Sequence, residues 1–292
     1  MRKLNCILFK IKELIMRKIR FFLSIVAILY TSFVFSASVD SIFIKSKSMN
    51  KEIGALVIKP ENYSTTNKEY PVIYILHGFS DTYGMFFQKV PKLTFFADVM
   101  NVIIVCPDGG YSSWYVNSPT DKTYQYETHI SSELITEIDT RFRTIKSPKG
   151  RAITGLSMGG HGALLMATNH PDVFGAAGSM SGGVDLTFKP KSWQIASRLG
   201  NYETNKEVWF KNSVFHQIQK LQGKNVALII DCGKDDFFYE INKKLHNKML
   251  ELKIPHDFII RPGEHSWEYW KSSIEFQMLF FYKFFYPQTE NK

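Results

Sequence analysis

From Val39 onward, hydrophobic positions form short continuous runs that alternate with longer amphipathic stretches. Continuous apolar runs bounded by turn residues are typical of strands buried on both faces of a parallel sheet. These runs predict strands at residues 41–46, 53–58, 71–76, 102–106, 151–154, 175–179, 226–231 and 257–261. The first two are expected to form an antiparallel hairpin that leads into the sheet.

Helical patterns separate most of these strands. They cover residues 84–98, 126–142, 159–169, 206–221, 238–252 and 267–285. Alternating strands and helices predict an α/β fold: a mostly parallel sheet of about eight strands with helices on both faces, in a single domain. The longest irregular stretches, 107–124 and 181–205, follow strand carboxyl ends, where ligands bind in open α/β sheets.

The N-terminal segment differs from the remainder in both charge and hydropathy. Residues 1–20 carry seven basic side chains against one acidic side chain, and an uncharged apolar run follows at 21–35. A basic stretch, an apolar run too short to span a bilayer, and small residues at 36–38 are typical of a secretory signal peptide. We predict a signal peptide at 1–37, a domain at 38–292, and a secreted or periplasmic location. An uncleaved N-terminal anchor is the alternative.

This leader accounts for most of the formal net charge of +9. Beyond residue 20, basic and acidic residues are nearly balanced and form no long runs. The chain therefore lacks the extended basic surface that binds phosphate backbones. We expect no nucleic-acid partner and no membrane contact beyond the leader, and the pattern indicates no particular oligomeric state.

The cysteines and histidines do not form a recognisable framework. Cys6 lies in the leader, whereas Cys106 and Cys232 each end an apolar run, so a disulfide between them is the less favoured alternative. The eight histidines show neither HExxH nor paired-cysteine spacing. No metal and no cofactor are predicted.

Residues 155–159, Gly-Leu-Ser-Met-Gly, match the pattern G-x-S-x-G. They follow a predicted strand and open a predicted helix, which is the setting of a nucleophile elbow. The glycines suit a turn too tight for side chains beside Ser157, and a helix N-terminus favours developing negative charge. Ser157 is therefore predicted as a nucleophile. The alternative is a tight glycine turn that holds an ordinary serine.

A serine hydroxyl is a weak nucleophile at neutral pH, so it requires a base, and the base requires an orienting group. Beyond an elbow serine, the acid and the base follow in that order along the chain. Asp235 and Asp236 lie after the strand at 226–231, and His265 lies between the last strand and the last helix. His265 is the predicted base. Four other histidines lie in or beside helices, where a structural role is favoured: His170, His216, His246 and His256.

Seven ordered segments carry a wider resemblance: YPVIYILHGFSD, PDGGYSSWY, YETHI, ITGLSMGGHGAL, DVFGAAGSMSGG, IDCGKDDFFYE and PGEHSWEYW. Together they resemble the esterase D-like family of α/β hydrolases, from about residue 45 to 285. That family includes tributyrin-type esterases, S-formylglutathione hydrolases, and the feruloyl and acetyl-xylan esterases of carbohydrate esterase family 1. The resemblance implies the α/β-hydrolase fold and a Ser, Asp, His triad.

Position by position, the resemblance places the nucleophile on Ser157 and the base on His265. It places the acid three residues after the glycine of the DCG loop, on Asp236, with Asp235 as the alternative. Asp231 is expected to end its strand as a structural residue.

An oxyanion hole requires backbone N–H groups that point at the tetrahedral intermediate. The residue after the nucleophile, Met158, and the turn after the LHG segment, at Phe79, are the expected donors. His77 and His161 are expected to hold this turn and the elbow helix by hydrogen bonds rather than to transfer protons.

Trp114 and Tyr115 follow a strand carboxyl end and offer flat surfaces suited to a sugar or phenolic ring. They are the candidate substrate-binding residues, and the alternative is that they pack the loop against the sheet. Core or rim packing is favoured for Trp267, Tyr269 and Trp270.

These features predict a secreted serine esterase that hydrolyses short-chain acyl or hydroxycinnamoyl esters, such as acetyl or feruloyl, including esters on carbohydrates. The alternatives are an S-formylglutathione hydrolase-like thioesterase and an acyltransferase to a sugar acceptor. The thioesterase is disfavoured because ILHGF stands where such enzymes resemble WLSGLTC. An inactive carbohydrate-binding homologue is disfavoured because all three triad residue types occur in order.

Overall fold

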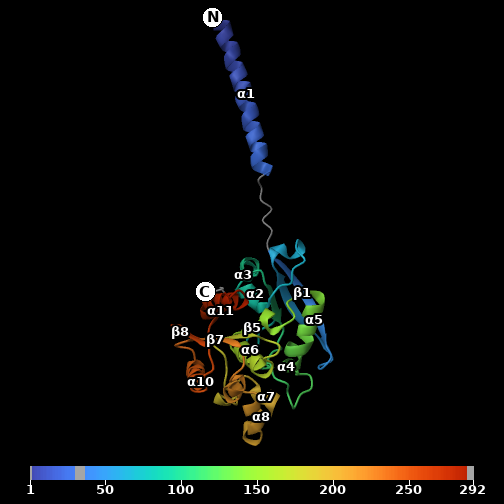
Figure 1. Cartoon of the computed structure of the whole chain (residues 1–292), viewed down its shortest axis with the longest axis vertical. Helices are drawn as coiled ribbons and strands as arrows, with labels where there is room; N and C mark the ends of the chain where they lie inside the picture. The colour runs from blue at the N-terminus through green and yellow to red at the C-terminus, as the bar shows by residue number, and fades with distance from the viewer. Residues whose placement is uncertain (1, 30–36, 288–292) are drawn as a thin grey trace. The chain divides into compact units, whose positions relative to one another are not determined.

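The computed structural model describes residues 2–29 and 37–287. The chain divides into two compact units, residues 1–35 and 36–292. The first unit contains helix α1 (Arg2–Leu29), drawn in blue in Figure 1. Among the described helices, none combines the length and apolar character that crossing a membrane requires. The predicted signal peptide at 1–37 includes undescribed residues, and its removal stays a prediction.

The second unit is built on an eight-stranded sheet with the strand order β1-β2-β4-β3-β5-β6-β7-β8. Pairings β1·β2 and β2·β4 are antiparallel, and all other neighbours are parallel. Each predicted strand is present within a few residues of its expected bounds, and the α/β-hydrolase fold class is confirmed. The strands are β1 (Ser38–Ser46), β2 (Lys51–Lys59), β3 (Val72–Leu76), β4 (Ile103–Pro107), β5 (Arg151–Gly155), β6 (Ala176–Met180), β7 (Ala227–Gly233) and β8 (Asp257–Arg261).

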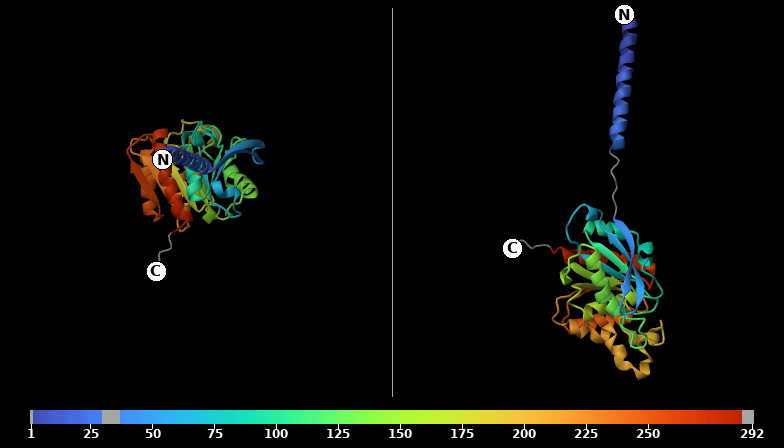
Figure 2. Two further views of the ribbon diagram at one scale, coloured as in Figure 1. Left: turned by 90° about the horizontal axis from the view of Figure 1, so that it is seen from above. Right: turned by 90° about the vertical axis from the view of Figure 1, so that its right-hand side faces the viewer.

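Helices lie on both sides of this sheet (Figures 1 and 2). The α-helices are α2 (Met85–Lys89), α3 (Leu93–Met100), α4 (Tyr126–Thr128), α5 (Leu134–Arg141), α6 (Met158–Asn169), α7 (Ile195–Leu199), α8 (Lys206–Lys211), α9 (Val214–Gln217), α10 (Tyr239–Glu251) and α11 (Trp267–Phe285). A π-helical turn, His129–Glu133, joins α4 to α5. Short 3₁₀ turns lie at Glu61–Ser64, Pro148–Gly150, Leu186–Phe188, Tyr202–Thr204 and Ile218–Leu221.

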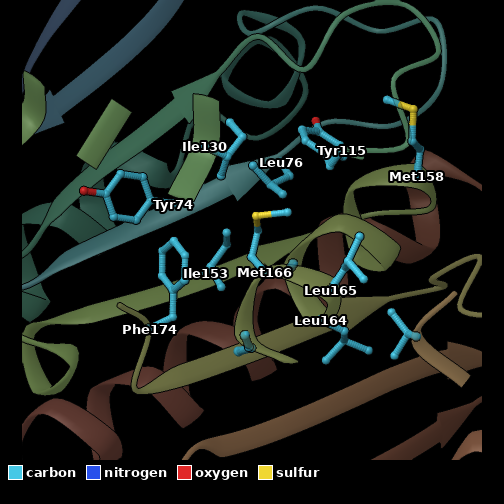
Figure 3. Close-up of a cluster of buried hydrophobic side chains, with 14 of the residues drawn as sticks. Tyr74, Leu76, Tyr115, Ile130, Ile153, Met158, Leu164, Leu165, Met166 and Phe174 are labelled. Carbon is cyan, nitrogen blue, oxygen red and sulfur yellow. The ribbon is translucent and has the colours of Figure 1, made fainter. Parts of the chain in front are cut away.

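Alternate residues of the central strands supply two separate apolar layers. In β3, Tyr74 packs into the layer under α5, α6 and α10, whereas Ile73 and Ile75 pack into the layer under α2, α3 and α11. Successive side chains of a strand point to opposite faces, so a continuous apolar run fills both layers. Figure 3 shows the first layer, where Met166 of α6 lies beside Ile153 of β5 and Leu76 of β3.

Two of the expected helices are interrupted. The pattern at 84–98 divides into α2 and α3 before Pro91, where Val90 leaves helical geometry. Proline lacks a backbone N–H and disfavours helical geometry in the residue before it, which explains this break. The pattern at 206–221 divides into α8, α9 and a 3₁₀ turn, because Asn212 and Ser213 stand outside helical geometry.

The two cysteines of the second unit are free thiols. Cys106 lies in β4 and Cys232 in β7, and both are buried. Burial raises the pKa of the Cys106 thiol to about 12, which keeps it protonated and unreactive. The expectation that these two residues form no disulfide agrees with the structure.

Candidate active site

Ser157 occupies a strained turn between β5 and α6. Its φ is 54° and its ψ is −114°, a region that non-glycine residues rarely adopt. The Ser157 N–H donates to the Met180 carbonyl at 2.9 Å, and its carbonyl accepts the His161 N–H at 3.1 Å. A side chain at Gly159 would overlap the Leu76 carbonyl of β3. The elbow therefore requires glycine because it packs directly against the neighbouring strand.

The structure brings Ser157, His265 and Asp236 into one hydrogen-bonded chain. They follow β5, β8 and β7, and the carboxyl ends of parallel strands meet at one edge of a sheet. Nε2 of His265 lies 2.9 Å from the Ser157 Oγ, and Nδ1 lies 2.9 and 3.0 Å from the two Asp236 oxygens. An ionised carboxylate only accepts, so Nδ1–H donates to Asp236 and Nε2 accepts the serine hydroxyl.

Asp236 rather than Asp235 faces the imidazole. The Asp236 side chain is fully buried, and its Oδ1 also accepts the Phe238 N–H at 2.7 Å. Asp235 is exposed, and its backbone N–H donates to the Gly263 carbonyl at 3.0 Å. The two neighbouring carboxylates therefore point in different directions, with one held by the histidine and the other in solvent.

Asp231 ties together the elements that carry the acid and the base. Its buried carboxylate pairs with Arg261 of β8 at 2.9 Å and accepts the Tyr269 hydroxyl of α11. Burial raises the pKa of the Asp231 carboxyl, with Tyr269 and Arg261 opposing that shift. The loops bearing Asp236 and His265 start from these two strands, so the structural role expected for Asp231 agrees with its position.

The two expected oxyanion donors, the backbone N–H groups of Phe79 and Met158, belong to the turn after β3 and to the start of α6. A Cβ placed on Gly78 would lie 3.7 Å from the Ser157 Cβ, so the turn after β3 lies beside the elbow. Among the backbone hydrogen bonds of turns, loops and helix caps in the described residues, none has the Phe79 N–H or the Met158 N–H as its donor. Met158 opens α6, where the first N–H groups of a helix have no internal partner. These two groups suit an anionic oxygen next to Ser157.

His77 and His161 hold backbone in place. His77 Nε2 accepts the Gly109 N–H at 2.7 Å, so its Nδ1 carries the proton and donates to the Gly78 carbonyl at 2.8 Å. His161 lies between the carbonyls of Trp114 and Asn212, at 3.0 and 2.9 Å. Burial lowers the pKa of His161 to about 4, so the ring is neutral at pH 7 and its single N–H donates to one of these two carbonyls. The structural roles expected for both histidines agree with these contacts.

The structure corrects the expectation that Trp114 and Tyr115 bind substrate. Trp114 is 2% exposed, and Tyr115 is fully buried with its hydroxyl donating to the His77 carbonyl at 3.0 Å. A side chain at Gly183 would collide with the Trp114 ring, and one at Gly162 would collide with Tyr115. The rings fill spaces that glycines leave open, so they pack the loop against the fold.

Replacing Trp114 with alanine should therefore destabilise the whole fold rather than one substrate complex. Loss of a fully packed tryptophan costs about 3–5 kcal/mol. Urea unfolding should show that loss, and kcat/KM should fall by a similar factor for methyl ferulate and p-nitrophenyl acetate. A selective loss on methyl ferulate with unchanged stability would restore the substrate-binding role.

Sequence reasoning did not single out Phe237, one of the aromatic side chains around His265, and it expected only core or rim packing for Trp270. The Phe237 ring lies 4.2 Å from the imidazole, and the Trp270 ring lies edge-on at 4.8 Å. Phe237 is 45% exposed although it directly follows the buried Asp236. The sequence signal for Phe237 was the pair of phenylalanines after the two aspartates.

With this geometry established, comparison with known proteins gives the family. The family model named Esterase matches residues 46–281. The chain belongs to the esterase family. This membership confirms the resemblance of the seven sequence segments.

Two curated relatives of this esterase-family chain come from mycobacteria. Esterase Rv1288 of Mycobacterium tuberculosis is 36% identical over 240 residues, covering 73% of this chain and 52% of that protein. The chain thus spans about half the length of that relative. Diacylglycerol acyltransferase/mycolyltransferase Ag85B of Mycobacterium leprae is 29% identical over 250 residues, covering 70% of this chain and 73% of that protein.

Solved structures of related enzymes share the fold. A ferulic acid esterase superposes with a TM-score of 0.74 at 28% identity, covering 86% of this chain and 100% of that one. An S-formylglutathione hydrolase from Staphylococcus aureus gives a TM-score of 0.74 at 21% identity, covering 84% of this chain and 99% of that one. At the lower identity the likeness shows the fold alone.

Proposed function

We propose that this protein hydrolyses carboxylic esters through an acyl-enzyme formed on Ser157. The observation that carries the proposal is the unbroken hydrogen-bond chain from the Ser157 hydroxyl through His265 to the buried Asp236 carboxylate. A serine that donates to a neutral, oriented imidazole can lose its proton as it attacks a carbonyl carbon. Membership of the esterase family supports the same chemistry.

In the first half-reaction His265 takes the Ser157 proton while Oγ attacks the ester carbonyl. The N–H groups of Met158 and Phe79 stabilise the negative charge that develops on the carbonyl oxygen. His265 then gives its proton to the departing alcohol, and Asp236 stabilises the intervening imidazolium. In the second half-reaction His265 activates a water, which releases the acid and restores Ser157.

Short-chain acyl or hydroxycinnamoyl esters, such as acetyl or feruloyl, are the proposed substrates, including esters on carbohydrates. The ferulic acid esterase likeness over 86% of the chain supports this class. Acyl transfer to a sugar acceptor is the second candidate, favoured by the Ag85B relationship. We also propose secretion or export to the periplasm, on the strength of the basic, then apolar, leader.

A substrate panel tests this function. Purified protein should hydrolyse p-nitrophenyl acetate and butyrate, methyl ferulate or acetylated xylan faster than p-nitrophenyl octanoate and S-formylglutathione. When a sugar acceptor is added, the free carboxylic acid should remain the main product. If the acylated sugar were the main product instead, the protein would be an acyltransferase. Activity confined to S-formylglutathione would contradict the ester proposal.

A further inference from the structure

An exposed group of aromatic rings extends from the histidine of the site. Phe188, Trp193 and Phe237 form this aromatic rim: Phe188 is 41% exposed, Phe237 is 45% exposed, and Trp193 is partly exposed. The rings of Trp193 and Phe237 stack, with 5.8 Å between their centroids and an angle of 16° between their planes. Phe237 in turn contacts the His265 ring at 4.2 Å. The rim is thus continuous with the proposed base.

The rim holds a lysine ammonium in a defined place. Lys189 Nζ lies 5.4 Å from the Phe188 ring, 5.8 Å from Trp193 and 5.5 Å from Phe237. Ring faces attract cations, so three faces restrict where this flexible side chain points. Lysine ion pairs within the described residues involve Lys59, Lys92 and Lys206, so the Lys189 charge is not neutralised by a carboxylate.

Buried groups fix the backbone beneath the rim. The Trp114 indole N–H donates to the Trp193 carbonyl at 3.1 Å, and the Ser112 hydroxyl donates to the Gln194 side chain at 2.9 Å. Trp193 and Gln194 both have left-handed backbone, with φ of 49° and 56°. Strain of this kind persists only where the surroundings enforce it. The buried Trp114 therefore supports the rim instead of binding the ligand itself.

The mechanism of ester hydrolysis determines which portion of a bound ester lies next to the aromatic rim. The general acid must lie beside the leaving oxygen, so the alcohol portion of the ester sits next to His265 Nε2. Phe237 packs on the same imidazole, and Lys189 is held over Phe237. An alcohol that carries a ring and a negative charge fits this surface, because the ring contacts the aromatic side chains while its charge faces the ammonium.

We propose that the aromatic rim and Lys189 form an alcohol subsite that selects esters of ring-bearing, anionic alcohols. This subsite rests on the proposed ester hydrolysis at Ser157. Lys189 is a specificity residue here and takes no part in the chemical steps.

The test compares two esters of nearly the same shape that differ in net charge: 3-acetoxybenzoate and its uncharged amide, 3-acetoxybenzamide. The native protein should show a kcat/KM about twofold to fivefold higher for the anion at low ionic strength, as expected for an exposed charge pair. This preference should weaken in 1 M salt, where the Debye length is about 3 Å. Lys189→Met should reduce the ratio to about one through a loss of turnover on the anion.

Lys191→Met is the matched control, since Lys191 is also exposed and its loss changes the net charge equally. It should keep the native preference, whereas Lys189→Glu should favour the amide. An unchanged anion-to-amide ratio of kcat/KM in Lys189→Met would overturn the subsite, and so would an equal fall of this ratio in Lys189→Met and Lys191→Met. In either case, turnover of the amide by the native protein would still support ester hydrolysis. Absence of turnover on both esters would overturn ester hydrolysis and the subsite together.

Discussion

Replacing Ser157 with alanine is expected to lower kcat for p-nitrophenyl acetate by about 10⁶-fold, because triad members act as a unit. The residual rate would come from binding and from the N–H groups of Met158 and Phe79 alone. A rate this low can be measured by incubating concentrated enzyme with substrate, stopping the reaction and quantifying the product. The melting temperature should change little, since the hydroxyl contributes little to packing.

Ser181 provides a control of the same chemistry. It is a buried serine with φ of 51° just after β6, at the same edge of the sheet as Ser157. Ser181→Ala should lower kcat less than about tenfold because no proton passes through this hydroxyl. A Ser157→Ala variant that kept more than a tenth of native activity would eliminate the mechanism.

Asp236→Asn is expected to lower kcat by about 10⁴-fold. The amide can donate to Nδ1, which moves the imidazole proton to Nε2 and removes the acceptor for the Ser157 hydroxyl. Asp235→Asn should cost less than about tenfold, since the Asp235 carboxylate is exposed to solvent. Both variants make the same chemical change one residue apart, so the comparison controls for charge. A larger loss at Asp235 would show that the assigned register is off by one.

Sequence alone could predict the elbow because its determinants are local. A strand, a glycine-flanked serine and a helix are adjacent along the chain, and the Gly159 contact with β3 explains why that glycine is required. His265 could be selected from eight histidines since it lies between the last strand and the last helix. The pairing of Asp236 with His265 required a register that the family resemblance supplied.

Exposure of the aromatic residues could not be predicted in the same way. Trp114 is buried against Gly183, and Tyr115 against Gly162, so each ring depends on a glycine distant in sequence. Phe237 is exposed although its neighbour Asp236 is buried, because the turn before α10 directs the two side chains apart. Such outcomes depend on tertiary packing, which the local pattern of hydrophobic residues does not predict.

Covalent labelling tests the central claim, that Ser157 is the nucleophile, most directly. The protein would be incubated with diethyl p-nitrophenyl phosphate, digested, and its peptides sequenced by mass spectrometry. One diethylphosphoryl group should appear on Ser157 in step with loss of esterase activity, and labelling should slow markedly in Asp236→Asn. Inactivation with the label on another residue, or full activity after stoichiometric labelling of Ser157, would contradict the mechanism.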